Sequence, residues 1–247
     1  PDALEAALRG ARTLYNTYWI RFERGGHTFD EAVARTVMLF RAAERAGVER
    51  IVHVSVSQPE RGAQAGLAYF RGKLRLEERL AGSGLPHAIV RPTLVFGPED
   101  ILVNNIAWML RRFPVFLVPG DGRYEVQPVS VRDTARICVD AEGTGDAAGP
   151  ERLTFETLVR LVRDAVGSHA RIVHGPAAIG LALTRIASAW LHDDVLTRDE
   201  VNGLTRSLLV GDAVTGTDRF SEWVVENANV LGRTYVSELA RNFRGQE

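Results

Sequence analysis

The sequence predicts an α/β fold in which helices alternate with the strands of a parallel sheet. From Thr28 to Gly47, apolar residues recur at helical spacing, and a buried strand follows up to Val56. From Ile51 to Gly97, the pattern reads strand, loop, helix and strand. Each segment is typical of a helix that crosses over between two parallel strands. The chain then becomes mostly helical after residue 150.

The remaining elements follow from breaker and capping signals. Proline starts and glycine stops the first helix, and pairs such as Thr197 with Glu200 are typical of capping boxes. Residues 142–150, rich in glycine and alanine, are interpreted as a linker, which gives one domain at residues 1–150 and a helical region at 151–247. The other elements expected in order are a helix at 1–9, a strand at 13–20, a helix at 67–81, a strand at 88–97, a helix at 100–112, strands at 113–118 and 124–131, a helix begun and capped by Asp133, and helices at 154–167, 177–191, 221–231 and 234–243, with a strand at 171–174.

Composition bounds the class of protein. The chain has 247 residues, 45% hydrophobic and 25% charged, with a net charge of −1, which favours a globular protein and no nucleic-acid partner. A single cysteine, Cys138, excludes an internal disulfide framework and indicates a reducing, cytoplasmic location without a metal cluster. The longest apolar stretch, Ala177 to Leu191, contains Arg185 and is too short to span a bilayer.

The most informative pair is Tyr69 and Lys73. Lys73 is the only lysine beside 29 arginines, and it lies one helical turn after Tyr69. We expect the ammonium to lower the pKa of the phenol, so that Tyr69 exchanges protons near neutral pH. A chance pair on a solvated helix face is the alternative. Ser55 and Ser57 end the strand before this helix and supply a hydroxyl on the same side, although either could be an ordinary strand or loop serine.

This order, a serine followed by Tyr-x-x-x-Lys, resembles the short-chain dehydrogenase/reductase superfamily. The resemblance implies a Rossmann-like doubly wound sheet, NAD or NADP as cofactor, and a smaller substrate-covering domain. It implies that Ser57 or Ser55 orients the substrate, that Tyr69 transfers the proton, and that Lys73 binds the nicotinamide ribose.

Two further stretches resemble the extended and atypical branches, including the branch with the dinucleotide-binding accessory subunit of respiratory complex I. The segment Arg91-Pro92-Thr93-Leu94-Val95-Phe96-Gly97-Pro98 implies cofactor contacts at Arg91, Pro92, Thr93 and Val95. Asn16 and Thr17 stand where the superfamily has a small-residue motif beneath the cofactor, and their size either narrows that site or serves packing. The region 119–133 implies a substrate pocket with Asn104, Asn105, Arg123 and Gln127 as contacts, or else only surface polar groups and a helix cap.

The sequence has no counterpart of the motif that would bind the phosphates of such a cofactor. No G-x-x-G-x-x-G or G-x-G-x-x-G motif follows a strand, and the sequence begins with proline, so it is interpreted as a fragment that lacks the first strands of the sheet. For the parent protein, the sequence predicts an NAD(P)-dependent oxidoreductase or epimerase/dehydratase acting on a sugar nucleotide, quinone or ketone, with a homo-oligomer left open. The alternative is a non-catalytic NAD(P)-binding accessory or redox-sensing protein.

Overall fold

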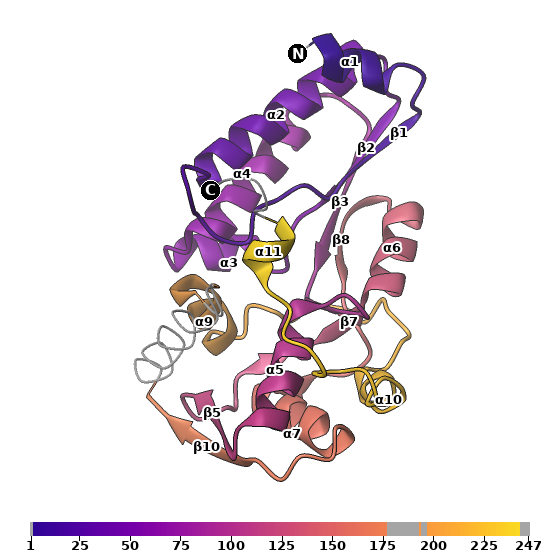
Figure 1. Cartoon of the computed structure of the whole chain (residues 1–247). Coiled ribbons are helices and arrows are strands. Elements are labelled where there is room, and N and C mark those ends of the chain that lie inside the picture. Colours follow the sequence, from indigo (N-terminus) through magenta and orange to yellow (C-terminus); the bar gives the residue numbers. More distant parts are fainter. Residues whose placement is uncertain (1, 177–192, 194–196, 243–247) are drawn as a thin grey trace.

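The computed structural model describes residues 2–176, 193 and 197–242. A parallel sheet with its covering helices lies at one end of the molecule, and a separate hydrophobic core lies at the other (Figure 1). The described elements are α1 Asp2–Leu8, β1 Thr13–Asn16, α2 Phe29–Arg45, β2 Arg50–Val54, α3 Pro59–Gln64, α4 Ala68–Ala81, β3 His87–Pro92, β4 Leu94–Phe96, α5 Ile101–Arg112, β5 Val115–Pro119, β6 Glu125–Val126, β7 Pro128–Ser130, α6 Val131–Asp140, β8 Gly143–Ala147, β9 Leu153–Thr154, α7 Phe155–Ala165, β10 Arg171–Gly175, α9 Arg198–Thr205, α10 Phe220–Glu226 and α11 Glu238–Asn242.

The main sheet has the strand order β1-β2-β3-β8, and every pair in it is parallel. Helices cover both faces: α2 and α4 lie on one side and α6 lies on the other (Figure 1). The alternation of strand side chains explains this double cover, because Ile51 packs with α2 and α4 whereas its neighbour Val52 packs on the α6 side. The predicted α/β class with a parallel, Rossmann-like sheet is confirmed.

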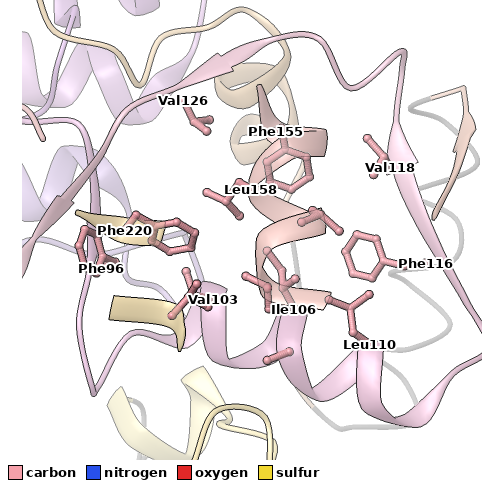
Figure 2. Packing of buried hydrophobic residues seen from close by; sticks show 14 of the residues in the cluster. Phe96, Val103, Ile106, Leu110, Phe116, Val118, Val126, Phe155, Leu158 and Phe220 are labelled. Atoms are coloured by element: carbon pink, nitrogen blue, oxygen red, sulfur yellow. The ribbon is translucent and has the colours of Figure 1, made fainter. Parts of the chain in front are cut away.

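The larger core lies beyond the carboxyl ends of this sheet. Helices α5 and α7 face one another there, and Figure 2 shows Ile106 and Leu110 of α5 beside Leu158 of α7. Phe220 of α10 and Phe116 of β5 complete the same cluster. The cluster therefore joins residues from both sides of position 150. The division into domains at that position stays a prediction.

Three local expectations are corrected. Residues 142–150 are not a linker throughout, because Gly143–Ala147 forms β8 and pairs with β3. The first strand ends at Asn16 rather than at residue 20. The cap of α6 is Ser130, whose side chain accepts the backbone N–H of Asp133 at 2.9 Å. Sequence patterns locate the ends of helices and strands only to within a few residues. Whether a short segment forms a strand depends on its pairing with a neighbouring strand.

Two other features bear on the earlier expectations. The capping box of Thr197 and Glu200 at the start of α9 is confirmed. The helix expected at 177–191 lies outside the described residues. In the part of the chain that the structure describes, none of the helices has the length and apolar character that crossing a bilayer requires.

Candidate functional site

A cavity of about 920 Å³ opens beyond the carboxyl ends of the sheet strands. Trp19, Val56 and Thr93, which follow β1, β2 and β3, line it together with Tyr69 of α4. Further lining residues come from α5, α9 and α11, which follow the strand β3 in the sequence. The carboxyl edge of an open parallel sheet is where such folds bind ligands. This cavity is therefore the candidate functional site.

Tyr69 stands among aromatic rings on the cavity wall. Its ring meets those of Trp19, Phe29 and Phe70 edge-on, with centroids 5.8, 5.9 and 5.5 Å apart. Burial among these groups raises the pKa of the Tyr69 phenol, and the carboxylate of Glu200 raises it further. The expectation that Lys73 lowers this pKa is wrong, because burial and Glu200 outweigh the cations near the phenol. The phenol is therefore protonated at neutral pH.

Lys73 is buried beneath the sheet edge, with only 3% of its surface exposed. Its Nζ donates a hydrogen bond to the Val54 carbonyl at 2.8 Å and lies 4.8 Å from the centroid of the Trp19 ring. Burial lowers the pKa of Lys73 to about 7, and the nearby Glu77 carboxylate opposes this shift. A charge that is only marginally favoured at neutral pH is thus held by a carbonyl and an aromatic face.

The two candidate serines differ sharply in their contacts. Ser57 is fully buried, and its Oγ donates to the Leu208 carbonyl at 2.7 Å, which ties β2 to the segment after α9. Ser55 is also buried, but its Oγ has no hydrogen-bond partner among the described residues. A buried hydroxyl without a protein partner is free to bond to a ligand or a water molecule. The geometry therefore favours Ser55 over Ser57 as a ligand contact.

Asn16 and His53 form a buried pair under the site. The Asn16 Nδ2 lies 2.8 Å from the His53 Nδ1, while the His53 Nε2 has no partner among the described groups. Burial, followed by the Lys73 charge, lowers the pKa of His53 to about 3, so its ring is neutral. Asn16 thus serves as a support for His53, and Thr17 beside it is exposed.

The four positions expected to contact the cofactor, at the end of β3 and just after it, are placed differently from one another. Thr93 and Val95 line the cavity. The Thr93 hydroxyl donates to the Gln127 carbonyl, and Pro92 lies buried at the end of β3. Arg91 points elsewhere: its guanidinium binds Glu77 and Glu60 in an ion-pair network.

The four expected substrate contacts do not line this cavity within the described residues. Asn104 and Asn105 hold the chain after α10, because their amides donate to the carbonyls of Thr234 and Val236 at 3.0 and 2.9 Å. Gln127 bridges the Gly149 carbonyl and the Gly211 N–H. Arg123 lies beside a second, shallower cavity. A role for them in substrate binding stays a prediction.

Sequence reasoning missed the charged wall of the cavity. Arg21 of the loop after β1 pairs with Glu200 of α9 at 2.5 Å and with Glu238 of α11 at 3.4 Å. Burial raises the pKa of Asp100, the N-cap of α5, to about 6. Arg21 and Glu200 are 179 positions apart, so no local pattern could have linked them. Among the described residues, groups of three or more histidine, cysteine or acidic side chains suited to a metal ion are absent.

Comparison with known proteins places this geometry in context. No family model matches the chain. It is 26% identical over 236 residues to the mitochondrial NADH dehydrogenase [ubiquinone] 1 alpha subcomplex subunit 9 of Arabidopsis thaliana, covering 85% of this chain and 56% of that protein. The mouse (Mus musculus) protein of the same name is 29% identical over 173 residues, covering 65% and 44%. The chain spans about half the length of the curated relatives it matches.

Solved structures show the same fold. Citrobacter sp. triphenylmethane reductase, complexed with NADP(H), gives a TM-score of 0.61 at 18% identity and covers 92% of this chain and 80% of its own. The UDP-glucuronic acid 4-epimerase of Bacillus cereus, in complex with NAD, gives 0.58 at 16% identity, covering 69% and 65%. The resemblance to the short-chain dehydrogenase/reductase superfamily, in its extended and atypical branches, is confirmed. The cofactors of these neighbours agree with the NAD or NADP expected from the sequence.

The relatives correct one prediction. The location was expected to be cytoplasmic, on the ground of cysteine usage. The curated relatives that match are mitochondrial proteins by name, which contradicts that expectation. One cysteine is compatible with any reducing compartment, so composition could not separate the two.

Proposed function

We propose that the chain forms the nicotinamide side of an NAD(P)-binding accessory protein of the short-chain dehydrogenase/reductase type. In this proposal Lys73 binds the cofactor, Tyr69 contributes ring surface beside it, and neither residue passes protons to a substrate. The observation that carries it is the placement of Lys73, whose ammonium is held by the Val54 carbonyl and the Trp19 ring. An efficient acid or base needs a pKa near the working pH, and burial moves the pKa of Tyr69 away from it.

The buried groups suit the nicotinamide end of a dinucleotide. Lys73 has three donors, and the Val54 carbonyl takes one of them. The Ser55 hydroxyl, unpartnered among the described groups, follows directly on Val54. Tyr69, Thr93 and Val95 add a phenol and apolar surface on the cavity side. A bound nicotinamide would supply hydride chemistry at this place, while the residues named here bind, orient and exclude water.

The relatives support the accessory role. They are named as subunits of NADH dehydrogenase, and the matches at 26% and 29% identity cover 85% and 65% of this chain. We therefore propose protein partners in a larger assembly beside the cofactor. Native electrophoresis of the source membranes, probed with an antibody to this chain, should place it in a complex far above its own 27.2 kDa.

A second candidate is an NAD(P)-dependent oxidoreductase or epimerase/dehydratase in which Tyr69 is the acid, Lys73 positions the ribose, and Ser55 or Ser57 orients the substrate. One observation favours it: Tyr69 lies on the wall of a cavity large enough for a small substrate. A protonated phenol can donate a proton to the substrate, which is compatible with catalysis in the direction of reduction.

Cofactor titration separates the two candidates. NAD⁺, NADH, NADP⁺ and NADPH are titrated by calorimetry into this chain and into the longest natural form that contains it. We expect Tyr69→Phe to keep the affinity within about twofold and Lys73→Met to lose at least about tenfold, because one charge-assisted hydrogen bond disappears. Tyr15→Phe and Arg71→Met, at exposed positions of β1 and α4, are the matched controls.

Turnover decides the outcome. Reduced cofactor is mixed with sugar nucleotides, quinones and ketones, and its absorbance is followed. The accessory proposal expects no consumption. Consumption that Tyr69→Phe abolishes would replace it by the oxidoreductase, and the lack of cofactor binding by the longest natural form would refute both.

A further inference from the structure

The charge of the candidate cavity is unusual for a site that would take a nucleotide substrate. Among the described residues that line it, five carboxylates stand against two guanidiniums, which leaves three negative charges in excess. Even Asp100, with its raised pKa of about 6, is mostly ionised at neutral pH. The acidic residues are Glu99, Asp100, Asp199, Glu200 and Glu238, and the basic ones are Arg21 and Arg241.

The cationic groups of this wall are already engaged by carboxylates. Arg21 binds Glu200 and Glu238, and Arg241 binds Glu99 at 3.2 Å. A diphosphate entering the cavity would have to displace a carboxylate from its partner. Its own negative charge would also face the acidic excess, which repels it in a partly buried site where screening is weak.

The helix ends that could hold an anion are also filled. The Asp100 carboxylate accepts the backbone N–H groups of Leu102 and Val103 at the start of α5, at 3.2 and 2.7 Å. At the start of α9, Thr197 and Glu200 cap one another. A helix amino terminus attracts anions through such N–H groups, and here the chain's own side chains take them.

The rest of the wall is apolar and aromatic. Trp19, Tyr69, Phe70 and Phe96 line the cavity with aliphatic neighbours such as Val56 and Leu204. Aromatic faces attract cations as well as apolar groups, and the attraction grows where water is excluded. An apolar, aromatic lining that also carries an excess of carboxylates suits a ligand that has an apolar body and a positive charge.

The geometry points to an apolar organic cation, with its charge spread over an aromatic body, as the ligand of this cavity. The inference deepens the proposed function, since it identifies the kind of molecule that would lie beside Tyr69 at the cofactor's nicotinamide end. It ranks cationic ligands above the anionic sugar nucleotides that the sequence led us to expect. The inference depends only on the residues that line the cavity, so the binding of a cation can be measured without the cofactor.

The test compares three probes that differ in charge. Crystal violet is an aromatic cation, its leuco form is a neutral molecule with the same substituents, and UDP-glucose is an anion. Each is titrated into the unaltered chain by calorimetry, and tryptophan quenching is followed in parallel. We expect crystal violet to bind at least about tenfold tighter than the leuco form, and its affinity to fall as salt rises, because the charges attract it across a screened distance.

A substitution in the lining tests whether crystal violet binds in this cavity. Asp199→Asn removes one lining carboxylate and keeps the side-chain shape, and we expect the affinity for crystal violet to fall about fivefold, since one unit charge near the ligand is lost. Asp140→Asn, at an exposed end of α6 outside the lining, is the matched control and should leave it unchanged. Circular dichroism and a thermal melt check that both variants fold.

The outcomes separate this inference from the proposed function. Equal affinity for crystal violet and its leuco form, or tighter binding of UDP-glucose, overturns the inference even where NAD(P)H binds. The comparison of the three probes needs only the unaltered chain, so it tests the inference even if Asp199→Asn fails to fold. Selective cation binding that Asp199→Asn weakens supports the inference, and a failed NAD(P)H titration would then count against the proposed function alone.

Discussion

The Trp19 indole covers the Lys73 ammonium, with the ring centroid 4.8 Å from Nζ. The same indole stacks on Phe29 and meets Tyr69 edge-on, both with centroids 5.8 Å apart. A ligand that needs Lys73 must therefore compete with an aromatic ring. Asn16 packs against His53, whereas Trp19 lines the cavity, so a narrowing of the cofactor site by Asn16 and Thr17 stays a prediction.

Gly72 makes room for this indole, and replacing it should displace the ring. A Cβ at Gly72 would lie 2.7 Å from the Trp19 Cη2 atom. We expect Gly72→Ala to lower the free energy of unfolding by about 1 kcal/mol despite the better helix propensity of alanine, because the packed ring must move. Urea titration and the tryptophan emission spectrum measure both effects.

The matched control is Gly203→Ala, also within a helix. There the nearest atom, on the Phe70 ring, is 3.4 Å from the added Cβ, which is ordinary contact. This variant should be neutral or more stable by up to about 1 kcal/mol. Equal effects of the two substitutions would show that the indole does not depend on Gly72.

Lys73 should make the free energy of unfolding depend on pH. Its pKa is about 10.4 in an unfolded chain and about 7 in the folded one, so between these values the unfolded state binds more protons. The free energy of unfolding then rises with pH from about 7 to about 10, by up to ~1.4 kcal/mol per unit. Below pH 7 both states are protonated, and the cost of burying the charge is present in full.

Lys73→Met isolates this contribution. We expect the variant to gain stability relative to the unaltered chain at pH 6 and to lose much of that advantage by pH 9, in denaturant titrations at both values. Arg71→Met, on the exposed side of the same helix, should show no such trend. A difference between Lys73→Met and the unaltered chain that is constant with pH would mean that Lys73 titrates normally.

The two serines of the β2 end should respond in opposite ways. Ser57→Ala leaves the buried Leu208 carbonyl without its 2.7 Å hydrogen bond, and we expect a loss of about 1–3 kcal/mol. Ser55→Ala removes a buried hydroxyl that has no partner among the described residues, so stability should stay the same or rise slightly.

Thermal melts and cofactor titration of both serine variants provide the measurements. Ser55→Ala should weaken NAD(P)H binding while keeping the fold. A stability loss in Ser55→Ala as large as that in Ser57→Ala would show that Ser55 is a structural group.

Gly149 is required by a close backbone approach. A Cβ there would lie 1.8 Å from the Pro128 carbonyl oxygen, and the Gln127 side chain donates to the Gly149 carbonyl at 2.8 Å in the same place. We expect Gly149→Ala to cost at least about 3 kcal/mol, because backbone must move against backbone. Gly145→Ala, in β8, meets nothing within 4 Å and should change stability by less than about 0.5 kcal/mol. Urea titration compares them, and a stable Gly149→Ala variant would show that β7 can shift freely.

Much of the fold was readable because its signals are local. Capping residues such as Thr28 and Thr197 mark helix starts through contacts three residues away. Short strands carry weaker signals, and β8 was missed because Gly143, Thr144 and Gly145 become a strand only by pairing with β3. The pair of Tyr69 and Lys73 was found because one helical turn separates them.

The sequence by itself determined the alternation of helices and strands, the place of Tyr69 and Lys73 on one helix, and the likeness of that helix to a known superfamily. Only the tertiary structure decided which groups surround those side chains. Trp19, Val54 and Glu200 come from three separate elements, and together they hold the ammonium and keep the phenol protonated. The reason is physical: a pKa depends on burial and on charges brought near by folding, and neither is encoded in the spacing of two residues along a chain.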